Sequence, residues 1–331
     1  MKATKVLITG STGYIGHELA LALAKMGYSV KALVRDINSP NIPKHNNIVL
    51  HQGDICEPNT LRKALLDCEC VFHLAAFTDI KSHNISKFYK INVEGTENLL
   101  KEAEALGVKK FILSSSLSVY GPALYRVPIT ETQPRLSSIN NDYELTKTMA
   151  EELTMEYANS NMSCTILNIS RVYGPGLKTY SNGVNKIIKK IMRNRFLITP
   201  SKLRSEANYV FIDDVIKAQI RAMHHSVNGE KYIIGGENAD YKKLFSVIKN
   251  IAKSKIKILQ INYKLMRSII AVYSRLNQLI GLNTLITPGV LDSLFTNRSA
   301  TSRKAEKELK YEITPLRKGI QKTVEHLKLE S

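Results

Sequence analysis

The stretch KVLITGSTGYIG at residues 5–16 decides the fold. Its first five residues, Lys5–Thr9, form an apolar run of strand length, and glycines follow at positions 10, 13 and 16. Glycines at this spacing allow a tight turn, a close approach of the backbone to a pyrophosphate, and close packing of a helix on a strand. Since residues 16–26 are amphipathic, we predict a strand, a phosphate-binding turn and a helix whose N-terminus faces the anion.

Short apolar runs and helical segments keep alternating to about residue 170. The strand-length runs are 30–34, 48–51, 71–75, 111–115 and 165–169, and the intervening helical segments are 61–66, 91–106 and 143–157. This rhythm predicts βαβ units and a parallel sheet covered on both faces. We therefore predict an α/β fold: a Rossmann doubly wound parallel sheet in residues 1–170, and a smaller, mostly helical C-terminal substrate lobe in residues 171–331. The two parts are expected to interleave, with strands near 209–212 and 232–234 returning to the sheet or extending it.

The end of the second predicted strand indicates which dinucleotide the turn holds. NAD-binding sites usually place an acidic residue there for the adenosine ribose, but this chain has Val34 followed by Arg35. A guanidinium clamps a phosphate bidentately, so NADP(H) is favoured and NAD(H) is kept as the second option. The alternative is that Asp36 takes the ribose and Arg35 is a solvated loop residue. Asp54, after the third strand, is a candidate acceptor for the adenine amino group.

Tyr143 and Lys147 stand four residues apart, so on a helix they share one face. A nearby ammonium is expected to lower the pKa of the phenol towards working pH, which suits a general acid or base for a carbonyl/alcohol pair. The serine run ending at Ser116 closes the preceding strand, where a hydroxyl can polarise the same carbonyl oxygen. The hydride chemistry would then come from a nicotinamide.

These motifs, in this order, resemble the extended (atypical) short-chain dehydrogenases/reductases of the NAD-dependent epimerase/dehydratase family. Beyond the segments already quoted, the motifs are GDI at 53–55, HLAA at 73–76, NVEGT at 92–96, SSSLSVYG at 114–121, VYGPG at 172–176, IDDV at 212–215 and YIIGGE at 232–237. The resemblance implies that Ser116 orients the substrate carbonyl and that Tyr143 donates or accepts the proton. It implies further that Lys147 binds the nicotinamide ribose and tunes Tyr143, and that Asn92 supports the active-site backbone. The cofactor contacts expected in all are Gly10, Thr12, Gly13, Tyr14, Ile15, Gly16, Arg35, Asp54, Ile55, Leu74, Ala75, Ala76, Ser114, Tyr143, Lys147 and Ser170.

Details of the motifs narrow the chemistry. Two segments resemble the sequences of the dihydroflavonol-reductase-like branch of the family: the end of the second predicted strand, 32–35, and the C-terminal stretch 303–311. This branch includes 3β-hydroxysteroid dehydrogenases and hopanoid-associated sugar epimerases. Leu117 follows the catalytic hydroxyl where 4,6-dehydratases carry an acidic residue nearby, and Ala207 stands where sugar-nucleotide epimerases grip a diphosphate with arginine. We predict an NAD(P)-dependent oxidoreductase acting on a ketone or secondary alcohol. The alternative is a sugar-nucleotide epimerase or reductase with tightly bound NAD, and a non-catalytic cofactor-binding scaffold is less favoured.

The net charge of +18 is concentrated in the second half of the chain. Residues 1–177 hold 18 basic and 17 acidic side chains, whereas residues 241–331 hold 18 basic and 6 acidic ones. The basic residues of 178–204 suit either an anionic substrate tail or a solvated surface. The segment 256–286 mixes basic and apolar residues at helical spacing, which fits a helix on anionic lipid. We favour the other interpretation, a lobe helix packed on its own core.

The remaining expectations concern partners and location. We expect a small-molecule substrate and no nucleic acid, because only charge favours the latter. The eight histidines show no metal-ligand spacing, so no metal is expected. Homodimers through the helices after Asn92 and Tyr143 are common in the family. Four cysteines without disulfide spacing, and no signal peptide or apolar span, predict a cytoplasmic protein; peripheral contact with an anionic membrane is left open.

Overall fold

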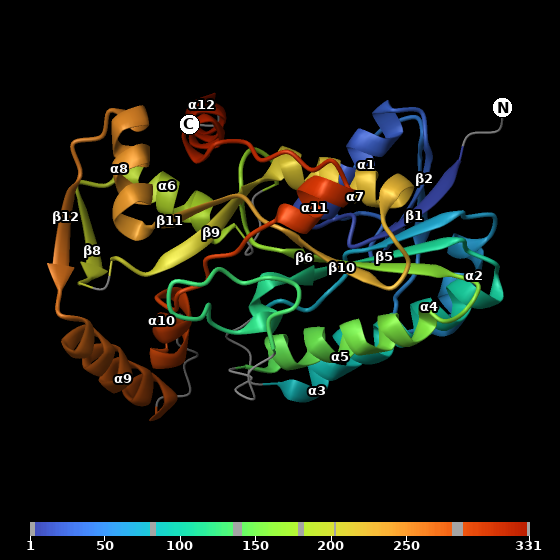
Figure 1. The fold of residues 1–331 in the computed structure, drawn as a ribbon, viewed down its shortest axis with the longest axis horizontal. Coiled ribbons are helices and arrows are strands. Elements are labelled where there is room, and N and C mark those ends of the chain that lie inside the picture. Colours follow the sequence, from blue (N-terminus) through green and yellow to red (C-terminus); the bar gives the residue numbers. More distant parts are fainter. Residues whose placement is uncertain are drawn as a thin grey trace.

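The computed structural model describes residues 4–79, 84–134, 141–177, 182–201, 203–279 and 287–329. At its centre is a seven-stranded sheet in which every neighbouring pair is parallel (Figure 1). Across the sheet the strands are β10 (Glu230–Ile234), β6 (Ser163–Ile169), β5 (Lys110–Ser116), β4 (Cys70–His73), β1 (Lys5–Thr9), β2 (Ser29–Val34) and β3 (Ile48–Gln52). The predicted Rossmann doubly wound α/β fold is confirmed.

Helices cover both faces of this sheet (Figure 1). One face carries α1 (Tyr14–Lys25) and α7 (Ile212–His225); the other carries α2 (Pro58–Leu65), α4 (Gly95–Ala105) and α5 (Asp142–Tyr157). The alternation of side chains along β1 explains the two layers, because Val6 and Ile8 join the core under α1 whereas Leu7 joins the core under α2 and α4. All three side chains are fully buried, as expected for a strand covered on both faces.

The lobe is built on two small sheets and several helices. Its three-stranded sheet has the order β11-β9-β7, and its two-stranded sheet pairs β12 with β8. The strands are β7 (Arg171–Tyr173), β8 (Phe196–Pro200), β9 (Glu206–Phe211), β11 (Glu237–Asp240) and β12 (Lys257–Ile261). The helices are α6 (Gly183–Arg193), α8 (Tyr241–Ala252), α9 (Tyr263–Leu279), α10 (Pro288–Leu294), α11 (Arg303–Glu308) and α12 (Leu316–Leu329).

The two parts of the chain interleave through a single strand. Of the two candidates for a return to the large sheet, β10 does return and pairs with β6, while β9 does not. The reason is that β10 occupies the edge of β6, so β9 pairs instead with β7, which continues the chain just beyond β6. The predicted basic segment 178–204 and the predicted amphipathic segment 256–286 are described only in part. Residues 178–181, 202 and 280–286 lie outside the described residues.

The burial of the predicted amphipathic segment 256–286 differs from the sequence prediction. Residues 256–286 were expected to pack their apolar side chains into the lobe core, but α9 leaves an apolar face exposed. Helical periodicity defines a face without stating which side meets the protein. The expectation is wrong for Leu265, Ile269, Val272 and Leu276, which are exposed, although Met266 and Ile270 do pack on the core. Within the described residues, no helix has both the length and the apolar content needed to cross a bilayer.

Candidate active site

The predicted phosphate-binding turn connects β1 to α1 at the carboxyl edge of the sheet. Gly10 has a φ of +72°, and a Cβ placed on it would lie 2.7 Å from the backbone nitrogen of Ala75. A Cβ on Gly16 would lie 2.3 Å from the carbonyl oxygen of Gly10. These contacts explain two of the three glycines. Gly10 permits the turn to pass over the end of β4, and Gly16 allows α1 to pack against the turn.

The N-terminus of α1 is left open for an anion. Gly13 is the N-cap and has no side chain to satisfy the N–H groups of the first turn, which begins with Tyr14 and Ile15. The buried hydroxyl of Ser11 has no hydrogen-bond partner within the described residues, and Thr12 follows it in the same turn. A dinucleotide pyrophosphate therefore fits this turn. The phenol of Tyr14 has another role, because it donates to the carbonyl oxygen of Gly174 at 2.8 Å.

A buried chain of hydrogen bonds fixes the strand ends beneath the turn. The hydroxyl of Thr96 donates to the carbonyl oxygen of Asn92 at 2.6 Å, so it accepts from Nε2 of His73 at 3.0 Å. Nδ1 of His73 then accepts from the hydroxyl of Thr9 at 2.7 Å, and Thr9 accepts the backbone N–H of Ala75 at 3.1 Å. Burial lowers the pKa of His73 to about 3, with Lys147 adding to the shift, so the ring stays neutral.

Asn92 lies on a π-helical turn, Lys90–Glu94, between α3 (Ile85–Tyr89) and α4. Its side chain accepts the backbone N–H of Phe77 at 2.7 Å and donates to the carbonyl oxygen of Phe77 at 3.1 Å. It also donates to the hydroxyl of Thr146 at 3.1 Å, immediately before Lys147. The buried Asn92 amide thus connects the loop at Phe77 to helix α5.

Helix α5 begins where the sequence provides a cap. The side chain of Asn141 accepts the backbone N–H of Glu144, and Asp142 and Glu144 place negative charge in the first turn. This start sets Tyr143 and Lys147 on the face that meets the end of β5. The ammonium of Lys147 donates to the carbonyl oxygen of Ser114 at 2.9 Å, while the Ser114 hydroxyl accepts from the amide of Gln219 in α7 at 2.6 Å.

The predicted catalytic residues come together, but their pKa values differ from the expectation. Burial, with Glu144 and Glu151, raises the pKa of the Tyr143 phenol to about 12, although its interaction with Ser116 acts to lower it. The predicted net lowering of the Tyr143 pKa is therefore wrong. Burial also lowers the pKa of Lys147 to about 8, against an opposing effect of Glu151. For both side chains, loss of hydration on burial is the largest cause of the pKa shift.

A buried carboxylate that was not predicted from the sequence lies one helical turn beyond Lys147. Glu151 accepts from the Ser115 hydroxyl at 2.5 Å and from the Asn168 amide at 2.6 Å, and it forms an ion pair with Lys231 at 3.0 Å. This network joins α5 to the strands β5, β6 and β10. The signal was present in the sequence, because Glu151 follows Lys147 by four residues and so shares its helix face.

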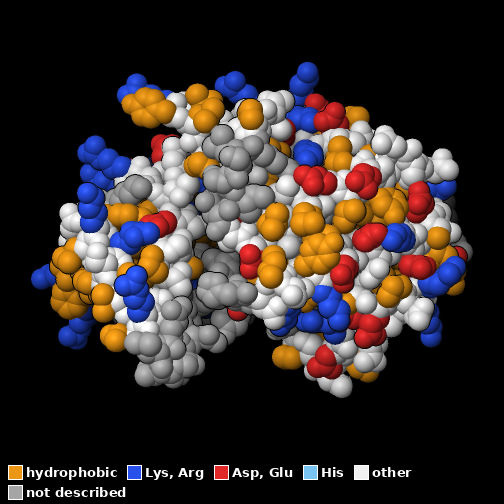
Figure 2. Space-filling view, turned by 90° about the horizontal axis from the view of Figure 1, so that it is seen from below, with side chains coloured by type: hydrophobic (Ala, Val, Ile, Leu, Met, Phe, Trp, Pro, Cys, Tyr) orange, Lys and Arg blue, Asp and Glu red, His pale blue; other side chains and the backbone are white. Residues whose placement is uncertain are grey.

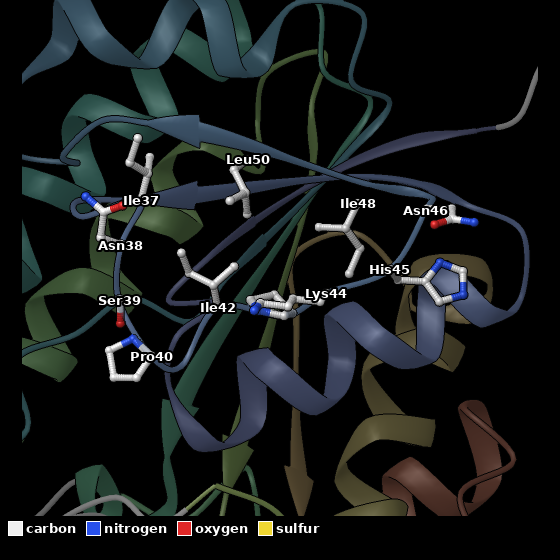
Figure 3. Close-up of a pocket in the computed structure, with 11 residues that line it drawn as sticks. Ile37, Asn38, Ser39, Pro40, Ile42, Lys44, His45, Asn46, Ile48 and Leu50 are labelled. Carbon is white, nitrogen blue, oxygen red and sulfur yellow. The ribbon is translucent and has the colours of Figure 1, made fainter.

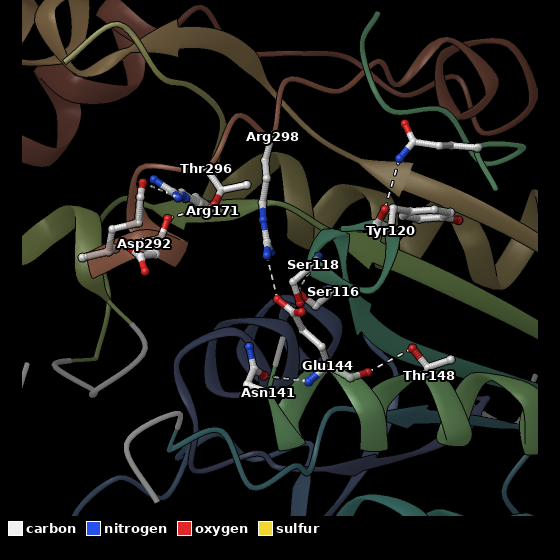
Figure 4. Close-up of polar contacts among 12 residues, drawn as sticks. Ser116, Ser118, Tyr120, Asn141, Glu144, Thr148, Arg171, Asp292, Thr296 and Arg298 are labelled. Atoms are coloured by element: carbon white, nitrogen blue, oxygen red, sulfur yellow. Dashed lines mark hydrogen bonds and ion pairs between the residues drawn. The ribbon is translucent and has the colours of Figure 1, made fainter. Parts of the chain in front are cut away.

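A second missed group reaches the site from the lobe. Arg298, in the segment after α10, extends to the start of α5 and pairs with Glu144 at 2.6 Å, close to Ser116 and Ser118 (Figure 4). Both side chains are nearly buried, with exposures of 11% and 5%. The backbone of Arg298 pairs with Ala207 in β9, and its N–H donates to the carbonyl oxygen of Glu206. The pair thus links the lobe to the residue adjacent to Tyr143.

The predicted adenosine contacts lie at the ends of β2 and β3. Arg35 is exposed, and within the described residues no hydrogen bond or ion pair engages its guanidinium. Asp36 accepts the backbone N–H of Asn38 at 2.8 Å, so its carboxylate already closes a local turn. Asp54 similarly accepts the N–H of Cys56 at 3.0 Å. Ile55 is buried and packs on Gly95, where a Cβ would lie 2.8 Å from its side chain.

The other predicted contacts lie closer to the catalytic residues. Leu74, Ala75 and Ala76 form the loop after β4, which Gly10 approaches. Ser170 follows β6, and its buried hydroxyl has no hydrogen-bond partner within the described residues. An open pocket also lies beside β3, under the loop after β2 (Figure 3). It is lined by Ile37, Asn38, Ser39, Pro40, Ile42, Pro43, Lys44, His45, Asn46, Ile48 and Leu50, and none of the predicted site residues lines it.

Comparisons with known proteins agree with the fold and the motifs. The NAD dependent epimerase/dehydratase family matches residues 6–235. A UDP-N-acetyl-alpha-D-glucosaminuronate decarboxylase of Bacillus cytotoxicus is 30% identical over 259 residues, which are 75% of this chain and 79% of that protein. A 3-beta-hydroxysteroid dehydrogenase of Mycolicibacterium neoaurum is 24% identical over 322 residues, 93% of this chain and 87% of that protein. The fold and these matches define an enzyme of the short-chain dehydrogenase/reductase class.

More particularly, the chain belongs to the NAD-dependent epimerase/dehydratase family. The fold agrees with a solved UDP-glucuronic acid 4-epimerase from Bacillus cereus in complex with UDP-glucuronic acid and NAD. That structure has a TM-score of 0.79 and 23% identity, and the match covers 99% of this chain and 100% of that one. Nicotinamide dinucleotides are the cofactor class of this family.

Proposed function

We propose that the protein is an NADP(H)-dependent oxidoreductase that interconverts a ketone and a secondary alcohol. The observation that carries the proposal is the grouping of Ser116, Tyr143 and Lys147 at the carboxyl edge of a Rossmann sheet, where Tyr143 interacts with Ser116 and Lys147 donates to the carbonyl oxygen of Ser114. We propose further that residues 1–170, with β10, hold the cofactor and that residues 171–331 bind the substrate. Ser170, with its unpaired hydroxyl, is proposed as a contact for the nicotinamide amide.

The proton chemistry follows from the two pKa shifts. A bound nicotinamide dinucleotide supplies the hydride acceptor or donor. In ketone reduction, Ser116 donates a hydrogen bond to the substrate oxygen and Tyr143 delivers a proton to that oxygen as it becomes an alcohol. Tyr143 is protonated at neutral pH because its pKa is raised, so it is already in the donating form. The Lys147 ammonium stabilises the phenolate left on Tyr143 after the transfer.

The pH dependence should report Lys147. Its pKa is lowered to about 8, so its stabilising charge is present below that pH and is lost as the pH rises through it. We expect kcat/KM for ketone reduction to fall above a pH of about 8. In Lys147→Arg, the guanidinium keeps its charge, so this alkaline limb should disappear even if the overall rate is lower. A limb that persists unchanged in Lys147→Arg would assign it to another group.

The preference for NADP(H) is inferred from the hydrogen bonding and burial of three side chains at the end of β2. Arg35 extends from the end of β2 without a partner within the described residues, while Asp36 is engaged by Asn38. Val34, where NAD-binding sites usually place an acid, is buried and apolar. A guanidinium without such a partner, next to the expected ribose, favours a 2′-phosphate, and the adjacent Asp36 carboxylate already accepts from Asn38.

Replacing Arg35 with Asp tests this choice. We expect NADPH affinity to fall about tenfold or more, because a charge-assisted bidentate contact is lost, while NADH affinity changes less. The measurement is a fluorescence titration of each nucleotide. Lys109→Asp is the matched control, since it makes the same charge change just before β5, at the opposite edge of the sheet. The NADP(H) assignment would be contradicted if wild type bound NADPH and NADH with equal affinity and if Arg35→Asp changed neither affinity.

A sugar-nucleotide epimerase or decarboxylase is the second candidate, because the relative from Bacillus cytotoxicus acts on a UDP-sugar. Such a substrate needs cationic groups for its diphosphate. Arg298 lies next to Ala207, where that arginine was sought, but its guanidinium is already paired with Glu144. This engagement favours the ketone/alcohol reaction. NAD that co-purifies with the protein, together with turnover of a UDP-sugar, would favour the second candidate instead.

A further inference from the structure

Helix α9 exposes a continuous apolar stripe at the far end of the lobe. Its side chains are between 54% and 58% exposed, and they are Leu265, Ile269, Val272, Tyr273 and Leu276. At about 100° per residue, these five positions fall within an arc of roughly 100° on the helix. Single exposed apolar residues are ordinary, but five on one helix face form an interaction patch. We refer to these residues as the α9 stripe.

The opposite side of α9 is fixed to the protein. Met266 and Ile270 pack against the main hydrophobic core, and Ser274 is buried. Asp292 of α10 accepts from the phenol of Tyr263 at 2.5 Å and from Nε of Arg267 at 3.1 Å. These contacts hold the helix in one rotation, so the α9 stripe cannot turn inward without breaking them.

Helix α9 itself carries basic residues and no acidic ones. Its basic residues are Lys264, Arg267 and Arg275, of which Arg267 pairs with Asp292 of α10. On α9 itself, the exposed Lys264 and Arg275 border one edge of the stripe. Figure 2 shows apolar side chains at this end of the molecule with lysines and arginines around them. The neighbouring strands add exposed Ile198 in β8 and Leu259 in β12.

We propose that the α9 stripe docks on an anionic lipid bilayer. The apolar side chains would enter the boundary between headgroups and acyl chains, and the basic side chains would meet the lipid phosphates. A second copy of this chain is a poorer occupant, because a symmetric contact would bring two equally basic surfaces together. The proposal does not depend on which nucleotide or substrate the active site takes.

Vesicle co-sedimentation tests the proposal. The probes are unilamellar vesicles of phosphatidylcholine alone and of phosphatidylcholine with an equal amount of phosphatidylglycerol. Wild type should bind the phosphatidylglycerol vesicles at least about tenfold more strongly, and salt should weaken this binding. Ile269→Ser with Leu276→Ser should lower the binding about tenfold or more. Val227→Ser is the matched control, because Val227 is similarly exposed (53%) but lies outside the lobe helices, between α7 and β10.

A second variant separates charge from apolar contact. Lys264→Glu with Arg275→Glu should also weaken binding and should remove most of its dependence on salt. Circular dichroism and the urea midpoint must match wild type in every variant, since the exposed side chains contribute little to folding. The proposal is overturned if wild type fails to bind phosphatidylglycerol vesicles, or if the serine variant binds as well as wild type. It is also overturned if the stripe instead mediates self-association, seen by sedimentation without vesicle binding.

Discussion

Tyr143→Phe is expected to lower kcat for ketone reduction by about 10²–10⁴-fold, the range typical of a lost general acid. The variant keeps the ring and removes only the hydroxyl that interacts with Ser116. Because the phenol donates its proton to the substrate oxygen, nothing else at that position replaces it. NADPH affinity should stay within a few-fold of wild type, since the proposed cofactor contacts on β1 and α1 are untouched.

The measurement is the steady-state rate of NADPH oxidation with a ketone that wild type reduces, chosen from a panel of ketones. Tyr157→Phe is the matched control, because it makes the same change on the same helix at the end far from Ser116. Its turnover should equal that of wild type. A Tyr143→Phe variant that retains turnover would reject Tyr143 as the acid, whatever the nucleotide preference.

The parts of the site that depend on local pattern were predictable from sequence. Strand β1, the glycine turn and helix α1 follow from residues 5–16, and the turn geometry at Gly10 requires the residue found there. Ser116 and Tyr143 come together because β5 ends at the first and α5 starts beside the second. A parallel sheet places all strand carboxyl ends along one edge, which makes this meeting predictable.

The electrostatics of the site could not be predicted from spacing. A lysine four residues after a tyrosine suggested a lowered phenol pKa, yet burial raises the pKa of Tyr143 to about 12. Burial depends on every element packed around the side chain, and the spacing of two residues carries no information about it. Glu151 adds negative charge near both groups through a network that reaches Lys231, 80 residues away in sequence.

The exposed side of α9 escaped prediction for a related reason. Its apolar residues have correct helical spacing, which equally suits a core helix and a surface helix. The direction in which α9 faces is set by Tyr263 and Arg267, which both bind Asp292 of α10. A contact between helices that are separated by residues outside the described part of the chain cannot be derived from a local pattern.

Arg298→Ala is expected to lower the free energy of unfolding by about 3–5 kcal/mol, because it removes the ion-pair partner Arg298 from the nearly buried Glu144 carboxylate. The Glu144 charge also lies next to Tyr143, whose pKa Glu144 already raises. Glu144→Leu combined with Arg298→Met is the matched control: it removes both charges while retaining apolar volume. Urea unfolding should show that this double variant recovers most of the loss.

The comparison of single and double variants distinguishes a buried pair from a surface contact. Arg298 is held in the lobe by its pairing with Ala207, and Glu144 lies in the first turn of the helix that carries Tyr143, the proposed general acid. If the pair is desolvated, the single variant is much less stable than the double. A loss below about 1 kcal/mol in Arg298→Ala would mean that water reaches Glu144 and that the lobe does not seal this end of the site.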